Sequence, residues 1–251
     1  MARNLGLLGF DFVFVDAQHA PIDALLLMQI IQTIHLSSQG KTVTIVRVPN
    51  LHSELITHAL DAGAAGIVFP HVDTAEQAEE AVKLVRYPCS GGHRSLAPAT
   101  LIPGKTDMAP PGSSPEQVAD NNIAVICQIE SPLGLENAEA IARTPGVDSL
   151  MMGPGDFRLS IGLPSKPIGG KEDPHFIQAL EKLVQVSRDC LKPLMTVSFK
   201  VTMPLEEWMG NFSILCTSAD LYSVMLDHIR QLRETQTVLQ RIGSRRLCDV
   251  A

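Results

Sequence analysis

The feature that most constrains this chain is the regular alternation of short apolar runs with longer segments of helical periodicity. Helical patterns cover 22–38, 53–62, 74–86, 132–143, 175–191, 205–209 and 220–242, and the apolar runs cover 10–16, 42–48, 66–71, 123–130, 147–152, 193–197 and 212–217. Neighbouring parallel strands need crossover connections, which are usually helical. The alternation therefore predicts an α/β fold with a parallel sheet.

The number of predicted strands bears on whether this sheet closes. A length of 251 residues suits one (β/α) barrel, which has eight strands, whereas the sequence predicts seven. We therefore expect a TIM-type (β/α) barrel that lacks its first strand at the N-terminus, with an open sheet as the alternative. The expected organisation is a single catalytic domain over residues 1–251 that ends in a long C-terminal helix at about 220–242.

Local signals support several of the predicted helix boundaries. Thr74 and Gln77 have the spacing of a capping box, and Gly63 suits the position just beyond a helix that Ser53 can cap. The stretch 87–122 interrupts the alternation, because it is rich in proline and glycine and has few periodic apolar positions. A loop of this length in a compact protein is usually functional or mobile.

Composition excludes several classes of function. The formal net charge is −7, which gives no basic field for binding nucleic acid or anionic lipid. No run of about 18 apolar residues is present, so we expect no membrane span. The five cysteines are dispersed and form no CxxC pair, which is typical of reduced thiols in a cytoplasmic protein.

Polar residues follow the apolar runs, at the positions where the predicted strands end. In parallel α/β folds, ligands bind at the carboxyl ends of the strands. The sequence thus predicts an active site from these residues: Asp16 with His19, Arg47, His71, Glu130, Asp156 and Thr217-Ser218.

Glu130 and Asp156 are the strongest candidates for metal ligands. They end consecutive βα units, so their carboxylates could converge on one ion, and such a pair suits Mg²⁺ or Mn²⁺. Each carboxylate could alternatively cap the helix that follows it. Gly153-Pro154-Gly155 precedes Asp156, and its glycines would allow the backbone to approach a ligand closely, although a plain tight turn is the alternative.

Asp16, His19 and Arg47 are candidates for acid–base and anion-binding roles. If Asp16 holds one ring nitrogen of His19, the other nitrogen could relay a proton through water, although a lone loop histidine is more often structural. Arg47 ends a valine-rich run and has no acidic neighbour in sequence. Its guanidinium needs either a carboxylate from another strand or an oxygen of the substrate.

Five segments are specific in combination: FDFVFVDAQHAP, VRVPN, RYPCSGGHRS, QIESPLGLENAEAIARTPGVDSLMMGPGDF and TSADLYSV. Together they resemble the class II pyruvate aldolases of the aldolase/citrate lyase family, such as 4-hydroxy-2-oxoheptanedioate aldolase and 2-keto-3-deoxy-glucarate aldolase, and their relative macrophomate synthase. The resemblance runs from about residue 10 to about residue 230.

The resemblance implies roles for individual residues. Glu130 and Asp156 match the metal ligands, and Arg47 matches the arginine that stabilises the enolate oxygen. His19, supported by Asp16, matches the histidine that activates the water serving as base. The remaining matches lie around the bound pyruvate: Gln128, Pro154 and Gly155.

The implied activity is a metal-dependent carbon–carbon lyase that forms or cleaves 4-hydroxy-2-keto acids through a pyruvate enolate. The cofactor would be Mg²⁺ or Mn²⁺, with Co²⁺ as a further candidate, and the partners would be a 2-keto acid and an aldehyde. Family members are often homo-oligomers, trimers or hexamers, with the last helix exchanged between subunits.

The sequence departs from the family pattern at three points. Gln18 replaces an acidic residue, Ser95 replaces a glycine after Arg94, and the family's first strand and helix have no counterpart before residue 10. Two alternatives therefore stay open. One is an oxaloacetate decarboxylase or an enzyme like macrophomate synthase. The other is a catalytically silent, truncated relative that acts as a binding or oligomer-forming protein.

Overall fold

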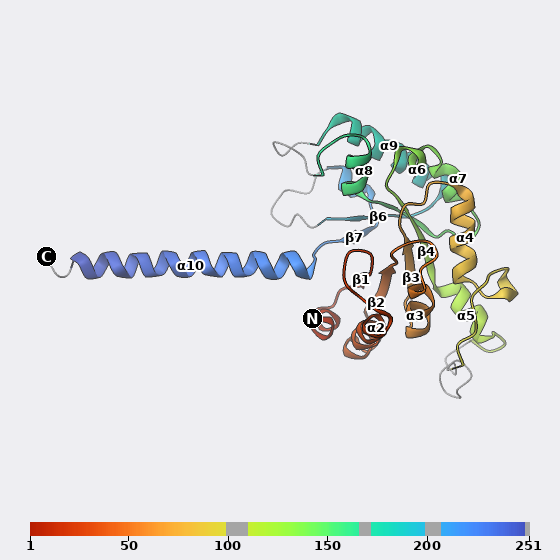
Figure 1. Ribbon diagram of the computed structural model, residues 1–251, viewed down its shortest axis with the longest axis horizontal. Helices are drawn as coiled ribbons and strands as arrows, with labels where there is room; N and C mark the ends of the chain where they lie inside the picture. Colours follow the sequence, from red (N-terminus) through yellow and green to blue (C-terminus); the bar gives the residue numbers. More distant parts are fainter. Residues whose placement is uncertain (99–109, 166–171, 199–206, 249–251) are drawn as a thin grey trace. The chain divides into compact units, whose positions relative to one another are not determined.

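The computed structural model describes residues 1–98, 110–165, 172–198 and 207–248. Its strands form one sheet in the order β1-β2-β3-β4-β5-β6-β7, with parallel pairing from β1 to β6. The sheet is a nearly closed barrel with helices outside it (Figure 1). Each strand lies at a predicted position: β1 (Phe12–Asp16), β2 (Val43–Arg47), β3 (Gly66–Phe69), β4 (Ala124–Ile129), β5 (Ser149–Met152), β6 (Leu194–Val197) and β7 (Ile214–Cys216).

Most helices also occur where the periodicity predicts them. The capping box of Thr74 and Gln77 is present at the start of α4, and Gly63 ends α3 with a left-handed φ of 98°. The pattern over 132–143 is divided into two helices at Asn137. These helices are α2 (Ala24–Ser38), α3 (Leu55–Ala62), α4 (Ala75–Val85), α6 (Pro132–Glu136), α7 (Ala138–Arg143), α9 (Pro174–Cys190) and α10 (Asp220–Cys248).

Other helices were not predicted. The helix α1 (Ala2–Leu7) has no side-chain cap to signal it, whereas α5 (Pro115–Asn122) has a capping box of Ser114 and Gln117 that the proline-rich context obscures. Two others in the described ranges are α8 (Pro154–Ser160) and the 3₁₀ helix η1 (Pro88–Ser90). The helix expected over 205–209 begins outside the described residues, and the 3₁₀ helix η3 covers Glu207–Asn211.

Alternation along the strands decides which side chains reach the interior of the barrel. In a strand, successive side chains point to opposite faces of the sheet. Val13, Val15 and other residues of one parity pack in the main apolar core with the helices. The opposite parity contains buried residues such as Ile45, Ile126 and Met151; the register pairs Ile45 with Phe14 and Met151 with Gln128. Asp16, Arg47, Gln128 and Glu130 share this second parity, so they face the interior near the strand ends.

The described part of the chain forms two compact units, one containing Met1–Val197 and the other containing α10. The predicted single domain over 1–251 stays a prediction. All the candidate site residues at the ends of β1 to β5 belong to the first unit. No helix among the described residues is long and apolar enough to span a bilayer.

Candidate active site

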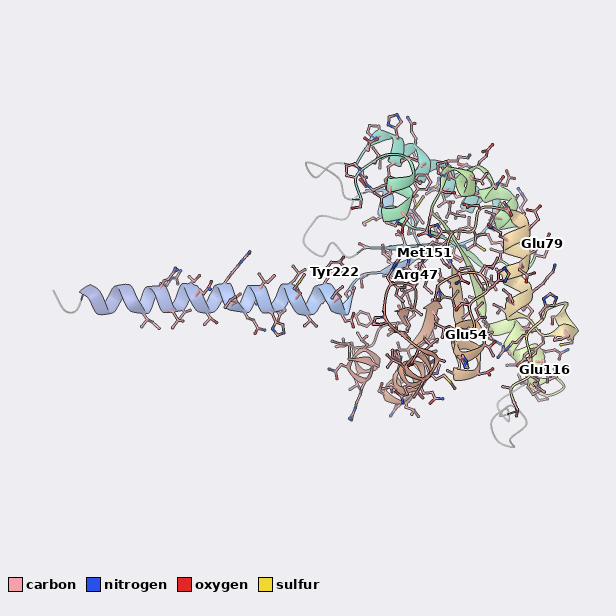
Figure 2. All side chains as sticks on the ribbon, in the orientation of Figure 1. Arg47, Glu54, Glu79, Glu116, Met151 and Tyr222 are labelled. Atoms are coloured by element: carbon pink, nitrogen blue, oxygen red, sulfur yellow. The ribbon has the colours of Figure 1, made fainter. Side chains whose placement is uncertain are left out.

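Arg47 forms an ion pair with Asp16 on the neighbouring strand. The register of β1 and β2 places Asp16 directly opposite Arg47. Arg47 Nε donates to Asp16 Oδ1 at 3.0 Å, and Arg47 Nη2 donates to Asp16 Oδ2 at 2.5 Å. Arg47 is the end residue of β2 and lies among the strands of the first unit (Figure 2). The sequence left two possible partners for Arg47, a carboxylate from another strand or an oxygen of the substrate. In the structure its partner is the carboxylate of Asp16 on the neighbouring strand.

The contacts of Asp16 differ from those that the sequence suggested. Its carboxylate binds the Arg47 guanidinium. Its Oδ1 also accepts hydrogen bonds from the backbone nitrogens of Gln18 and His19, at 3.0 and 3.3 Å. The carboxylate therefore holds the His19 backbone, and its side-chain partner is Arg47. Burial raises the pKa of Asp16, but the hydrogen bonds and charge of Arg47 and the two N–H groups outweigh it. The net pKa is lowered.

Glu130 is a buried carboxylate at the end of β4, with a residue exposure of 2%. Gln128 Nε2 donates to Glu130 Oε1 at 2.7 Å, and the His71 N–H donates to Glu130 Oε2 at 3.1 Å. Burial raises the pKa of Glu130, and the negative charge of Asp156 raises it further, while His71 and Arg47 oppose both effects. Glu130 is thus within electrostatic reach of Asp156, Arg47 and His71.

Asp156 lies in the first turn of α8, which begins at Pro154 directly after β5. A carboxylate in this turn is favoured by the positive end of the helix dipole. The side chain is exposed, unlike that of Glu130. The structure therefore places the two predicted metal ligands on consecutive βα units, with one carboxylate inside the barrel end and the other at its rim.

Gly153 allows the backbone after β5 to pass close to Glu130. A Cβ at this position would lie 2.4 Å from Glu130 Oε1 and 2.7 Å from Gln128 Nε2. Such distances are far shorter than van der Waals contact, so a side chain here would displace Glu130 and Gln128. Pro154 and Gly155 follow as the first helical residues, and a Cβ on Gly155 would meet no atom within 4 Å.

The donor set fits a hard divalent cation. The Oε1 atom of Gln128 is buried beside Glu130 without a hydrogen-bond partner, which leaves an oxygen available at the site. No group of three or more His, Cys, Asp or Glu side chains in the described ranges could hold a metal. A cation held here would depend on two carboxylates, and Mg²⁺ commonly takes its other ligands from water or substrate.

His71 and Gly153 also belong to this site. The sequence predicts a close backbone approach at Gly153, and the structure shows this approach toward Glu130. The sequence predicts His71 only as one of the polar residues at strand ends, with no specific role. In the structure its ring Nδ1 lies 3.4 Å from Glu130 Oε2. That His71 lies beside Glu130 depends on the register of β3 against β4, which the sequence alone does not show. His19 is exposed, in the loop after β1.

Comparison with known proteins identifies the family. Residues 1–203 match the family model described as HpcH/HpaI aldolase/citrate lyase. The chain is 30% identical to a hydroxypyruvate/pyruvate aldolase of Paraburkholderia phytofirmans over 97% of its length and 88% of the relative's. It is 34% identical to a 5-keto-4-deoxy-D-glucarate aldolase of Klebsiella pneumoniae over 75% of its length and 69% of the relative's.

Solved structures agree with this assignment. The crystal structure of macrophomate synthase superposes with a TM-score of 0.87 at 31% identity, covering 96% of this chain and 81% of that one. A HpcH/HpaI aldolase/citrate lyase family protein from Burkholderia cenocepacia superposes with a TM-score of 0.81 at 27% identity, covering 94% and 89%. The chain therefore belongs to the HpcH/HpaI aldolase/citrate lyase family, and it is a carbon–carbon lyase on a TIM-type barrel.

Proposed function

We propose that this lyase is a divalent-metal-dependent aldolase that forms or cleaves 4-hydroxy-2-keto acids through a pyruvate enolate. The observation that carries the proposal is the buried Glu130 carboxylate at the end of β4, with Asp156 in the first turn of the helix that follows the neighbouring strand β5. Two relatives named as aldolases of hydroxypyruvate/pyruvate and of 5-keto-4-deoxy-D-glucarate support this substrate class.

Glu130 and Asp156 would hold Mg²⁺, Mn²⁺ or Co²⁺, which supplies Lewis-acid stabilisation of the negative charge that develops on the keto oxygen. Arg47 would add a permanent positive charge at the same place. Its contacts with Asp16 use two of the five guanidinium N–H groups, so three can still donate to a substrate oxygen. Asp16 would keep the guanidinium oriented while it does so.

Gln128, Pro154 and Gly155 would surround the keto acid, with Gly155 offering backbone that no side chain covers. His19 lies in the loop that Asp16 orders, and it would activate the water that removes or returns the proton. The aldehyde would enter from the same end of the barrel. We further propose that the protein acts as a cytoplasmic homo-oligomer, a trimer or hexamer.

The similarity to macrophomate synthase favours a second candidate, decarboxylation of oxaloacetate. This reaction would use the same residues, because loss of carbon dioxide from oxaloacetate also leaves a pyruvate enolate. Both activities release pyruvate, so one assay measures both with different substrates.

The test is pyruvate release by the full chain after chelation and addition of Mg²⁺, Mn²⁺ or Co²⁺. We expect metal-dependent release, and Asp156→Ala should reduce it by more than about 100-fold, since even outer partners of metal ligands cost 10–100-fold when removed. Cys89→Ala, which changes an exposed thiol, is the control and should keep wild-type activity. Wild-type protein that releases no pyruvate with any of these metals would instead favour the catalytically silent relative.

A further inference from the structure

The backbone and the ring of His71 both lie close to one oxygen of Glu130. Its backbone N–H donates to Glu130 Oε2 at 3.1 Å, and its ring Nδ1 lies 3.4 Å from the same atom. The other oxygen, Oε1, accepts from Gln128. The carboxylate is thus fixed by the neighbouring strand through one oxygen and by its own strand through the other.

The backbone of His71 is in an unusual conformation, with a φ of 52°. L-residues rarely adopt a left-handed φ outside turns and helix ends. Gln39 and Leu191, the other described non-glycine residues with positive φ, both occupy the C-cap positions of helices, where this conformation is common. His71 follows β3 and has no helix to end, so local structure does not account for its conformation.

We propose that His71 is a positioning residue whose left-handed backbone and ring hold Glu130 in the orientation that binds the divalent cation. The inference rests on the proposed function, because it requires Glu130 to be a metal ligand. Strained backbone that persists at a site is typically kept for a functional geometry. Carboxylates that bind metals are themselves oriented by hydrogen-bonding partners, and losing such a partner weakens metal binding about 10–100-fold.

The test is Mn²⁺ affinity of the full chain, measured from the electron paramagnetic resonance signal of free Mn²⁺, together with the Tm of the metal-free protein. His71→Gly removes the ring but keeps the N–H and relieves the left-handed φ. We expect a Tm higher by about 2–4 °C and Mn²⁺ binding weaker by about tenfold or more.

His71→Asn is the rescue variant, because asparagine tolerates the left-handed region and carries an N–H donor at the position of ring Nδ1. We expect its Mn²⁺ affinity to stay within about threefold of wild type, which is small beside the loss of about 10–100-fold expected when a hydrogen-bonding partner of a metal ligand is removed. Gln39→Gly is the matched control, since it relieves a similar φ of 55° at a helix end. It should change Tm without changing Mn²⁺ affinity.

The outcomes separate this inference from the proposed function. If Asp156→Ala loses Mn²⁺ binding while His71→Gly binds as tightly as wild type, the positioning role is wrong and the metal site stands. Equal weakening in His71→Gly and His71→Asn would overturn the assignment of this role to a donor at the position of ring Nδ1. If the wild-type protein itself binds no Mn²⁺, both proposals fall.

Discussion

At the scale of single residues, Gly153 shows how closely the site is packed. Its backbone passes so close to Glu130 that a Cβ would lie 2.4 Å from Oε1, and any other residue would force the carboxylate to move. The glycine is therefore required by the neighbouring carboxylate as well as by the turn into α8. The carboxylate that makes glycine necessary at this position stands at the end of β4, a different segment of the chain.

Gly153→Ala should displace Glu130, lower stability by about 1–3 kcal/mol as overpacked sites do, and weaken Mn²⁺ binding. Chemical denaturation and Mn²⁺ titration measure the two effects. Gly210→Ala is the matched control, because a Cβ there meets no atom within 4 Å, and it should change stability by about 0.5 kcal/mol or less. Unchanged stability and metal affinity in Gly153→Ala would show that Glu130 can move freely, contrary to the site described above.

The site residues also show which details could be read in advance. Asp16, Arg47, Glu130 and Asp156 were predicted because each follows a strand pattern. The partner of Arg47 could not be chosen, since it depends on the register of β1 against β2, and either a carboxylate or a substrate oxygen was open. The φ of His71 leaves no mark in the sequence, because the residue type is compatible with many backbone conformations.

At the scale of elements, His35 links α2 to the sheet and to the end of α3. Its Nε2 lies 3.5 Å from Thr44 Oγ1 on β2, and its ring edge lies close to Gly63, where a Cβ would be 3.3 Å from Cε1. Burial lowers the pKa of His35 below 6.5, because the charged imidazolium would lose solvation between these elements.

The protein should therefore become less stable as the pH falls through about 6.5. The unfolded chain binds a proton at His35 near this pH, whereas the folded protein binds it only at a lower pH. As the pH falls below 6.5, the unfolded state therefore binds more protons than the folded state, and the free energy of unfolding decreases. Tm measured from pH 7.5 to pH 5.5 should fall less steeply for His35→Gln than for wild type. His175→Gln, at an exposed ring, is the control. Equal slopes for His35→Gln and wild type would contradict the prediction.

Element positions were predicted with more success where local signals were strong. The capping box at Thr74 sets the start of α4 through contacts between residues three apart, so it could be read directly. The similar box at Ser114 lies within a proline-rich stretch that obscures the helical signal of α5, and α1 has no side-chain cap. Short helices without caps are determined by packing, and α1 packs against α2, where Gly6 fits closely against Ser37.

At the scale of the whole molecule, α10 presents large apolar side chains to solvent. Leu226 and Leu232 are 51% and 58% exposed, and Leu221, Tyr222, Val224, Met225, Ile229, Val238, Leu239 and Ile242 are also exposed. Apolar surface of this extent usually marks an interaction site. It supports the expectation of a homo-oligomer.

We expect light scattering after size-exclusion chromatography to give the mass of an oligomer for the full chain. Replacing Leu226 and Leu232 together by glutamate should shift the mass toward the monomer, since charged residues oppose burial of this helix. Gln236→Glu adds a charge on the same helix without removing an apolar side chain, and it should leave the mass unchanged. An oligomer that survives the double substitution would place the interface elsewhere.

The sequence by itself determined the order of strands and helices, the α/β class and the residues that stand at strand ends. These follow from hydrophobic periodicity and from local signals, which act between residues near one another in the chain. Tertiary structure alone decided that Arg47 pairs with Asp16, that Gly153 must lack a side chain, and that His71 reaches Glu130. The physical reason is that these contacts join different strands, whose register is set by packing of the whole barrel and by no single segment.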